Sequence, residues 1–228
     1  MAMIRIRTRI RKSSQVTPPG PPPAPASGLR TPLPTKQTRS RKTRDALIAA
    51  AWKLLEAQPW QVISINDIVK AAGCSVGAFY SRFTDKEALL EALAAKWIEE
   101  RWGERERGFA SLTADADYAA HAILGTYHHL MRYQNFWRAA LVKGASDQVF
   151  WEPFRASGLR TIELTMQCHE RRLGRKMSED EIQRIRFAFQ MANGAINNGI
   201  VNRPGPLLPG TREFEVELVR GFKAVGFR

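Results

Sequence analysis

The chain has 228 residues, of which 44% are hydrophobic and 25% charged, so it can bury the core of one or two ordinary domains. No apolar run approaches the roughly 18 residues that a membrane span needs, and residues 1–12 lack the apolar stretch of a secretion signal. These properties exclude a membrane-spanning or fibrous chain and favour a soluble, cytoplasmic protein.

The net charge of +13 is concentrated at the amino end of the chain. Residues 1–44 contain eleven Lys or Arg and no acidic residue, which leaves a charge of only +2 on residues 45–228. A cluster of positive charges suits a nucleic-acid backbone or an anionic membrane surface, because binding releases counterions or follows the surface potential. Charge alone leaves both partners open.

Residues 1–38 are predicted to form a disordered, basic, proline-rich arm. Eight of the thirteen prolines lie between Pro18 and Pro34, where they prevent a helix and leave little apolar material to bury. The first segment, IRIRTRIRK, alternates apolar and basic residues, but one strand without a partner is not stable in water. An extension without a function of its own is the alternative interpretation.

Three helices are predicted next in the chain. Apolar residues recur at intervals of three and four from Leu47 to Leu55, which predicts a helix over residues 40–57. Ser64 is placed to begin a second helix as its N-cap, and that helix is expected to stop at Gly73. Ser75 is placed to cap a short third helix over residues 76–82.

The remaining chain also follows a helical pattern. Thr84 and Glu87 have the spacing of a capping box, so we expect Thr84 to begin a long amphipathic helix. Further helices are predicted over residues 115–132, 134–144, 147–172, 178–201 and 211–226, the last two capped by Ser178 and Thr211. No segment alternates clearly enough to predict a sheet, so the predicted fold class is all-α.

Residues 68–90, IVKAAGCSVGAFYSRFTDKEALL, place two short helices around a glycine turn. This is a helix-turn-helix, in which the second short helix can enter the major groove of DNA. Beyond this geometry, the segment from about Thr43 to Leu93 closely resembles the TetR family of bacterial transcriptional regulators. The resemblance implies an N-terminal three-helix DNA-binding domain, residues 39–85, followed by a larger helical ligand-binding and dimerisation domain, residues 86–228.

The resemblance also implies which residues contact DNA. Val76, Gly77 and Ala78 would lie against base edges, while Tyr80 and Lys86 match the family's phosphate-contacting tyrosine and lysine. The complete set of expected DNA-binding residues is Arg41, Lys42, Arg44, Ser64, Asn66, Ser75, Val76, Gly77, Ala78, Tyr80, Ser81, Arg82 and Lys86. The competing interpretation is that Ser64, Ser75 and Thr84 serve only as helix caps.

The helix predicted over residues 178–201 is apolar on two sides, so it needs two packing partners. One side is expected to face its own domain. The other, formed by Phe187, Met191, Gly194, Ala195 and Asn198, is the expected interface of a homodimer. A two-fold dimer predicts a palindromic DNA site. Packing of these residues within one subunit is the alternative.

The resemblance implies a pocket for a small-molecule inducer among the middle helices. The residues expected to line it are Trp102, Tyr127, His128, Met131, Trp137, Gln190, Asn193 and Asn197. Further large or soft groups come from Phe136, Phe150, Trp151, Phe154 and Cys168. Such a mixture could line an apolar cavity with a few orienting hydrogen bonds, although aromatic residues at helical spacing are more often core.

The sequence contains no arrangement that predicts catalysis, a cofactor or a metal. His121 and His128 are seven residues apart, which is too far for joint metal ligation, and Cys74 and Cys168 have no zinc-site spacing. We therefore expect two free thiols and a chain that is not an enzyme.

The predicted function is that of a sequence-specific transcriptional regulator, a repressor released from a palindromic operator by a small-molecule inducer. Its expected partners are double-stranded DNA, a second copy of the chain and the inducer. The alternative is an architectural protein that coats DNA through its basic arm with little sequence preference. Anchoring of the arm to a membrane surface is a third possibility.

Overall fold

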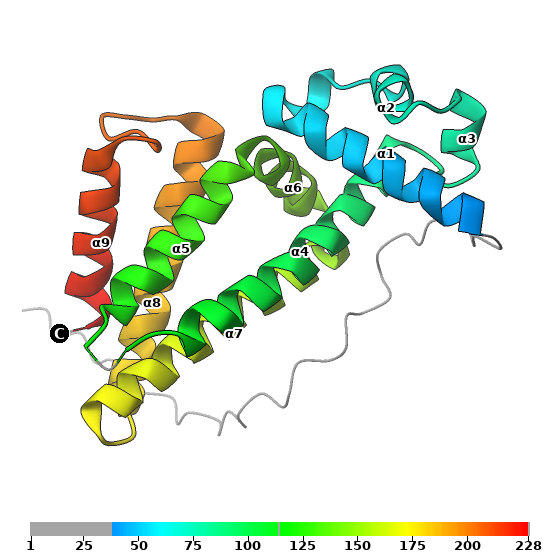
Figure 1. The fold of residues 1–228 in the computed structure, drawn as a ribbon. Helices are drawn as coiled ribbons and strands as arrows, with labels where there is room; N and C mark the ends of the chain where they lie inside the picture. The colour runs from blue at the N-terminus through cyan, green and yellow to red at the C-terminus, as the bar shows by residue number, and fades with distance from the viewer. Residues whose placement is uncertain (1–37, 114, 228) are drawn as a thin grey trace, which may run out of the picture.

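The computed structural model describes residues 38–113 and 115–227, and this part of the chain forms nine α-helices and one short 3₁₀ helix (Figure 1). The predicted all-α fold class is confirmed. The proline-rich segment of the predicted arm, residues 1–37, lies outside the described residues. In the described ranges, no helix is both long and apolar enough to cross a lipid bilayer.

The first helices gather at one end of the molecule (Figure 1). They are α1 (Thr38–Ala57), the 3₁₀ helix η1 (Trp60–Val62), α2 (Ile65–Ala72) and α3 (Val76–Tyr80). Leu47, Ile68 and Phe79 are fully buried where these helices meet. The sequence pattern did not predict η1, whose three residues are too few to show a period.

The ends of α2 and α3, and the turn between them, are set by the residues predicted from the sequence. Ser64 caps α2 in a capping box with Asp67, and Gly73 ends the helix in the left-handed conformation with φ of 64°. This conformation is readily available to glycine because it lacks a Cβ. The Ser75 hydroxyl accepts a hydrogen bond from the Ala78 amide at 3.1 Å and begins α3.

Helix α3 ends two residues earlier than predicted. The amide of Arg82 donates to the Phe79 carbonyl at 2.8 Å, which tightens the chain into a turn after Tyr80. The Arg82 guanidinium also donates to the Ala78 carbonyl at 2.8 Å and so satisfies an oxygen of the last helical turn.

Helix α4 (Lys86–Ala110) leads from this small domain into the rest of the molecule. Its predicted cap was wrong, because Asp85 and not Thr84 is the N-cap. The Asp85 carboxylate accepts a hydrogen bond from the Ala88 amide at 2.7 Å. A carboxylate is favoured over a hydroxyl at the positive end of the helix dipole, and both residues fit the same local pattern.

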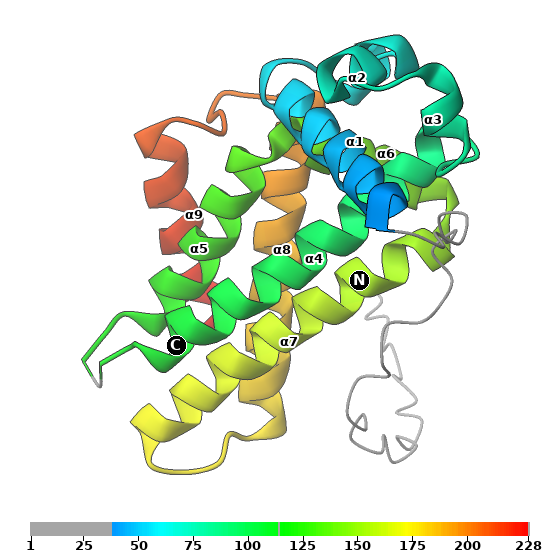
Figure 2. The same cartoon turned by 45° about the vertical axis from the view of Figure 1, so that its right-hand side comes forward.

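The remaining helices form the larger domain (Figure 2): α5 (Tyr118–Arg132), α6 (Gln134–Ser146), α7 (Gln148–Leu173), α8 (Glu179–Asn202) and α9 (Arg212–Gly226). Their bounds lie within three residues of the predicted ones. Ser178 and Thr211 cap α8 and α9 as predicted. Helix α7 runs beside α4, and α9 packs on α5 and α8.

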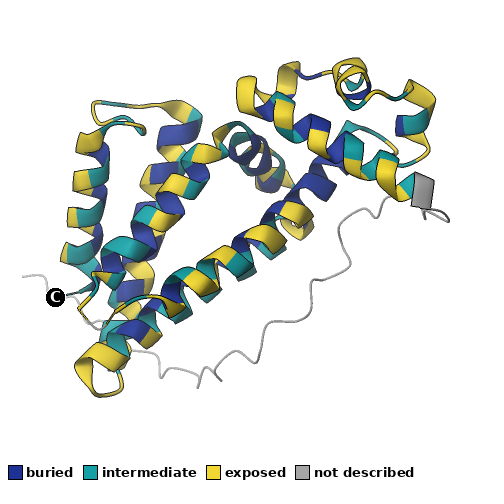
Figure 3. Ribbon diagram, in the orientation of Figure 1, coloured by how far each residue is buried: buried dark blue, intermediate teal, exposed yellow. Residues whose placement is uncertain are grey.

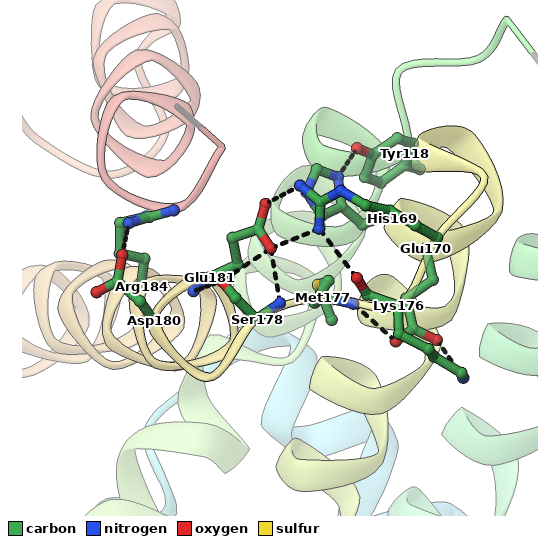
Figure 4. A network of polar contacts seen from close by, with 10 residues as sticks. Tyr118, His169, Glu170, Lys176, Met177, Ser178, Asp180, Glu181 and Arg184 are labelled. Carbon is green, nitrogen blue, oxygen red and sulfur yellow. Dashed lines mark hydrogen bonds and ion pairs between the residues drawn. The ribbon is translucent and has the colours of Figure 1, made fainter.

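The turn between α7 and α8 lies at the end of the molecule remote from α3 (Figure 1), and its polar contacts are shown in Figure 4. Glu181 pairs with Arg175 at 2.7 Å and accepts from the Ser178 amide at 2.7 Å, and these hydrogen bonds lower the pKa of its carboxyl. Nearby, the Tyr118 hydroxyl and His169 Nδ1 are 2.5 Å apart. The helix cap and the ion pairs of this network therefore stabilise the short turn between α7 and α8.

The buried side of α4 forms the centre of the core (Figure 3). Trp97 stacks on Trp137 of α6 with ring centroids 5.4 Å apart. It also contacts Phe136 of α6 and Phe154 of α7, each at 5.7 Å between centroids. Three helices therefore meet on one indole ring, and such aromatic contacts add to the burial of apolar surface.

The cap of α4 leads to a stability prediction. Replacing Asp85 with Ala should lower the free energy of unfolding by about 1 kcal/mol, because an amide of the first turn loses its partner. Urea unfolding followed by circular dichroism measures the change. Thr84→Ala is the matched control and should have little effect, since Thr84 is exposed and is not the N-cap. Equal losses for both variants would contradict the assignment.

Candidate nucleic-acid interface and internal cavity

Helix α3 presents an exposed face at the surface of the small domain. The side chains of Val76 and Tyr80 are 40% and 50% exposed, while Phe79 between them is fully buried. Gly77 is also exposed, and the Ser75 hydroxyl oxygen, 3.9 Å away, is the nearest neighbour of the position that a Cβ would occupy there. The helix is thus anchored on one side and open on the other, as insertion into a groove requires.

Two of the predicted cationic contacts are held against the small domain. Lys86 Nζ donates to the Trp60 carbonyl at 2.5 Å and lies 4.6 Å from the centroid of the Trp60 ring. Partial burial lowers the pKa of Lys86. Arg82 Nε donates to the Ser40 carbonyl at 3.2 Å. Both cations brace the domain in this arrangement, which sequence spacing did not reveal.

The other predicted DNA-binding residues fall into two groups. Arg41, Lys42, Asn66, Ser75 and Ser81 are exposed, whereas Arg44 and Ala78 are half-buried. Ser64 is exposed as well, but its hydroxyl donates to Asp67 Oδ2 at 2.6 Å and accepts from the Asp67 amide at 3.1 Å. The hydroxyl of Ser64 is therefore engaged as a helix cap.

The larger domain contains a cavity of about 760 Å³. Its walls come from α4, α5, α6, α7 and α8, and they include the aromatic rings of Trp97, Trp137, Trp151 and Phe154. This volume is in the range of pockets that bind small organic molecules. A cavity with aromatic walls at this position could bury the apolar body of such a molecule.

Four of the eight residues predicted to line a pocket line this cavity: Trp137, Gln190, Asn193 and Asn197. Trp151 and Phe154, named as further candidates, line it too. The Trp137 indole donates to Asn197 Oδ1 at 2.9 Å, which orients the amide. Helix α8 therefore supplies polar groups to a wall that is otherwise largely aromatic.

The other four predicted residues do not line the cavity. Trp102 is half-buried, and Tyr127 is buried with its hydroxyl oxygen accepting from the Gly210 amide at 2.6 Å. His128 is exposed and lies 3.0 Å from Glu215 of α9, and Met131 packs near the segment that leads into α9. Tyr127 instead joins α5 to the segment before α9, and His128 joins α5 to α9 itself. Helical spacing alone could not show whether these side chains face another helix or the cavity.

Sequence reasoning missed the cation in the cavity wall. Arg101 of α4 is only 7% exposed and lines the cavity, with its guanidinium 5.0 Å from the centroid of the Trp97 ring. The sequence gives a weak signal, since Arg101 follows Trp97 by four residues and must share its buried face. A charged residue on a helix is usually solvated, so the signal is easily overlooked.

Positive charge affects the neighbouring histidine as well. Burial, reinforced by Arg101, Arg105 and Arg132, lowers the pKa of His129 to about 3. Its imidazole is consequently neutral at physiological pH. Burial also lowers the pKa of Arg105 to about 10. His129 therefore adds no positive charge next to Arg101 and offers it no compensating negative charge.

The face of α8 that was predicted to form a dimer is open. Phe187 and Met191 are 53% and 42% exposed, and Gly194, Ala195 and Asn198 are exposed along the same side. Val216 of the neighbouring helix α9 is 45% exposed. The opposite side of α8, with Ile185, Phe189 and Ile196, is buried within the domain. The predicted second apolar side of α8 is thus accessible in a single chain.

Residues 47–93 match the family model described as bacterial regulatory proteins, tetR family. These residues contain α2, α3 and the turn between them. Over 96 residues, the chain is 35% identical to the HTH-type transcriptional regulator EthR of Mycolicibacterium smegmatis. That match covers 41% of this chain and 44% of the relative, so the chain spans less than half the length of the curated relative that it matches.

Solved structures extend the similarity over most of the fold. A TetR-family transcriptional regulator from Mesorhizobium loti is 19% identical with a TM-score of 0.58, covering 83% of this chain and 95% of that chain. One from Streptomyces coelicolor is also 19% identical, with a TM-score of 0.57 and coverage of 81% and 80%. RolR in complex with resorcinol has 23% identity, a TM-score of 0.53 and coverage of 82% and 89%.

Proposed function

We propose that this chain, whose residues 47–93 match the model of the tetR family of bacterial regulatory proteins, is a TetR-type repressor that a small molecule releases from a palindromic operator. The observation that carries the proposal is the exposed face of α3, held outward by the buried Phe79. The family regulates transcription and is not an enzyme family. We place its action in the bacterial cytoplasm, where the DNA lies.

Base recognition would depend on the amino-terminal turn of α3. Val76, Gly77 and Ala78 carry no hydrogen-bonding side chain, so they would read methyl groups and groove shape by close approach. Ser75 and Tyr80 are exposed on either side and could bind phosphate. Arg41 and Lys42 add positive charge near the start of α1. The basic arm would add affinity without sequence preference.

Arg82 and Lys86 would act chiefly by positioning this surface. Arg82 joins α1 to the end of α3 through the carbonyls of Ser40 and Ala78, and Lys86 joins the start of α4 to η1 through Trp60. Each also adds positive potential at the surface that faces the DNA backbone. Contact of either with phosphate would require it to leave its carbonyl partner.

A homodimer formed through α8 and α9 would complete the regulator. Two recognition helices related by a two-fold axis match a palindromic site, whereas one short helix reads too few base pairs for specific binding. The exposed Phe187, Met191 and Val216 support this interface because isolated chains rarely expose neighbouring large apolar side chains without a function. Close approach of the helices is favoured by Gly194 and Ala195.

The cavity would hold the effector. The similarity to RolR, whose structure contains resorcinol, supports a small organic ligand in this domain. A ligand changes DNA binding only if it has different affinities for the two arrangements of the protein. The cavity walls contain two helices that also contact the DNA-binding domain, namely α4 and α6.

Helix α6 connects the cavity to α1 directly. Trp137 lines the cavity, while the preceding residue, Phe136, packs on Trp52 of α1 with ring centroids 4.9 Å apart. Asn135 donates to the Leu55 carbonyl of α1 at 2.9 Å. Movement of the cavity wall would therefore be transmitted to α1 as well as along α4.

The operator can be found by selecting bound genomic fragments with the full chain. Val76→Glu should then weaken operator binding about a hundredfold, roughly 3 kcal/mol, because a carboxylate would face phosphates and base edges. Fluorescence anisotropy on the operator and on a scrambled duplex at physiological salt measures both affinity and preference.

Leu173→Glu is the matched control for this prediction. Leu173 is 37% exposed, close to the 40% of Val76, and lies at the α7–α8 end remote from α3. It should leave operator affinity unchanged. Equal affinity of the wild-type chain for operator and scrambled DNA would reject the repressor in favour of an architectural protein that coats DNA.

The dimer predicts a second outcome. Met191→Glu places a charge at the centre of the proposed interface and should shift the protein from dimer to monomer, as measured by analytical ultracentrifugation. Val149→Glu on α7 is the control, since Val149 is 61% exposed and lies outside α8 and α9. A wild-type monomer, or a Met191→Glu dimer as stable as the wild type, would exclude this interface.

A further inference from the structure

Arg101 is a buried cation with an unsatisfied donor. Its side chain lies on α4 in the wall of the cavity, and the residue is 7% exposed. Its Nη1 atom is buried and has no hydrogen-bond partner. Arginine remains protonated in proteins, so the group cannot avoid this cost by losing its proton. Buried charges are normally paired, because a buried charge without a partner is strongly destabilising.

The residues around Arg101 supply little negative charge to balance its guanidinium. Arg105 repels it and Glu104 attracts it, yet the Glu104 side chain is 63% exposed and its carboxylate lies 4.0 Å from His129. In residues 38–113 and 115–227 the structure shows no ion pair to Arg101. The neutral His129 provides no negative charge.

The charged residues that line the cavity are all positive. Arg101, Arg155 and Arg186 line it, and none of its lining residues is Asp or Glu. Arg155 and Arg186 are exposed, so water screens their charges, and Arg155 also pairs with Glu152 at 3.0 Å. Arg101 is then the cation in the interior of the wall, and a ligand with a negative group would satisfy it.

A second unpaired donor lies beside the first. The indole Nε1 of Trp97 is buried without a hydrogen-bond partner, and Trp97 also lines the cavity. Arg101 lies 5.0 Å from the Trp97 ring, so both donors belong to one patch of α4. A carboxylate has two acceptor oxygens and can accept from a guanidinium and an N–H together.

The rest of the wall suits an apolar body. Leu130, Trp137, Trp151 and Phe154 contribute apolar surface, with Trp151 and Phe154 stacked at an interplanar angle of 25°. A highly charged ligand such as a nucleotide would place polar groups against these apolar surfaces, which is unfavourable. The wall therefore favours a single anionic group on an otherwise apolar molecule.

We propose that the cavity binds an organic carboxylate with an apolar body, whose carboxylate is bound by the guanidinium of Arg101 and the indole N–H of Trp97. That this carboxylate is the effector of the regulator rests on the proposed function. That the cavity binds a carboxylate does not depend on DNA and can be tested on the full chain alone. The charge-assisted hydrogen bonds set the ligand class, and the aromatic wall sets its apolar part.

Isothermal titration calorimetry on the full chain tests this ligand class. The probes are benzoate, 2-naphthoate, indole-3-acetate and decanoate, each compared with its primary amide. The amide has nearly the same shape and lacks the charge. At least one acid should bind about tenfold or more tightly than its amide, as one charge-assisted hydrogen bond to a buried group implies.

Variants assign the preference to one residue. Arg101→Gln should reduce the acid-to-amide ratio to about one, and Arg101→Lys should retain part of it because the positive charge remains. Arg107→Gln is the matched control, since Arg107 is exposed on the same helix and does not line the cavity. Circular dichroism establishes that each variant is folded.

The comparison of acids with amides on the wild-type chain stands even if Arg101→Gln does not fold. Amides that bind as tightly as their acids, no binding of any acid, or a preference that survives Arg101→Gln would overturn the proposal. Operator binding is measured separately on ligand-free protein. Acid preference through Arg101 without any operator binding would reject the regulatory function while supporting the carboxylate site.

Discussion

The contact of Trp97 with α6 and α7 is the interaction on which the arrangement depends. Its ring stacks on Trp137 and meets Phe136 and Phe154, so it helps to fix the long helix α4 to α6 and α7 of the larger domain. The same ring lines the cavity, and α4 begins at Lys86 beside the DNA-binding helices. Eleven residues separate Lys86 from Trp97, about 16 Å at the helical rise of about 1.5 Å per residue. A ligand that moves Trp97 would therefore move a rigid element in direct contact with the DNA-binding domain.

Local chemistry made much of the fold predictable. Ser64, Gly73, Ser75 and Ser178 determine helix ends through hydrogen bonds within a few residues, so their roles could be inferred from the sequence and are confirmed. The open face of α8 likewise follows from its helical period. The family motif adds the outward placement of α3, a feature that spacing alone could not supply.

The errors arose where the outcome depends on tertiary contacts. Asp85 competes with Thr84 for the same cap, and local pattern does not decide between neighbouring oxygen-bearing side chains. His128 was expected to line the cavity but pairs with Glu215 of α9. The first residue of α9, Arg212, follows His128 by 84 residues, so a local pattern could not predict this contact. Arg101 was missed because its burial depends on helices α5 to α8 closing around it. Four of the eight residues predicted to bind a ligand lie in the cavity wall, and three of them are amides of α8.

Reciprocal coupling between the cavity and the DNA is the most direct test of the account. Calorimetry would measure the dissociation constant of a bound carboxylate for the protein alone and for the protein saturated with its operator. Because coupling free energies are reciprocal, the ligand must weaken operator binding by the same factor by which the operator weakens ligand binding. The account predicts that operator-bound protein binds the carboxylate at least about fivefold more weakly. An identical dissociation constant with and without operator would contradict it.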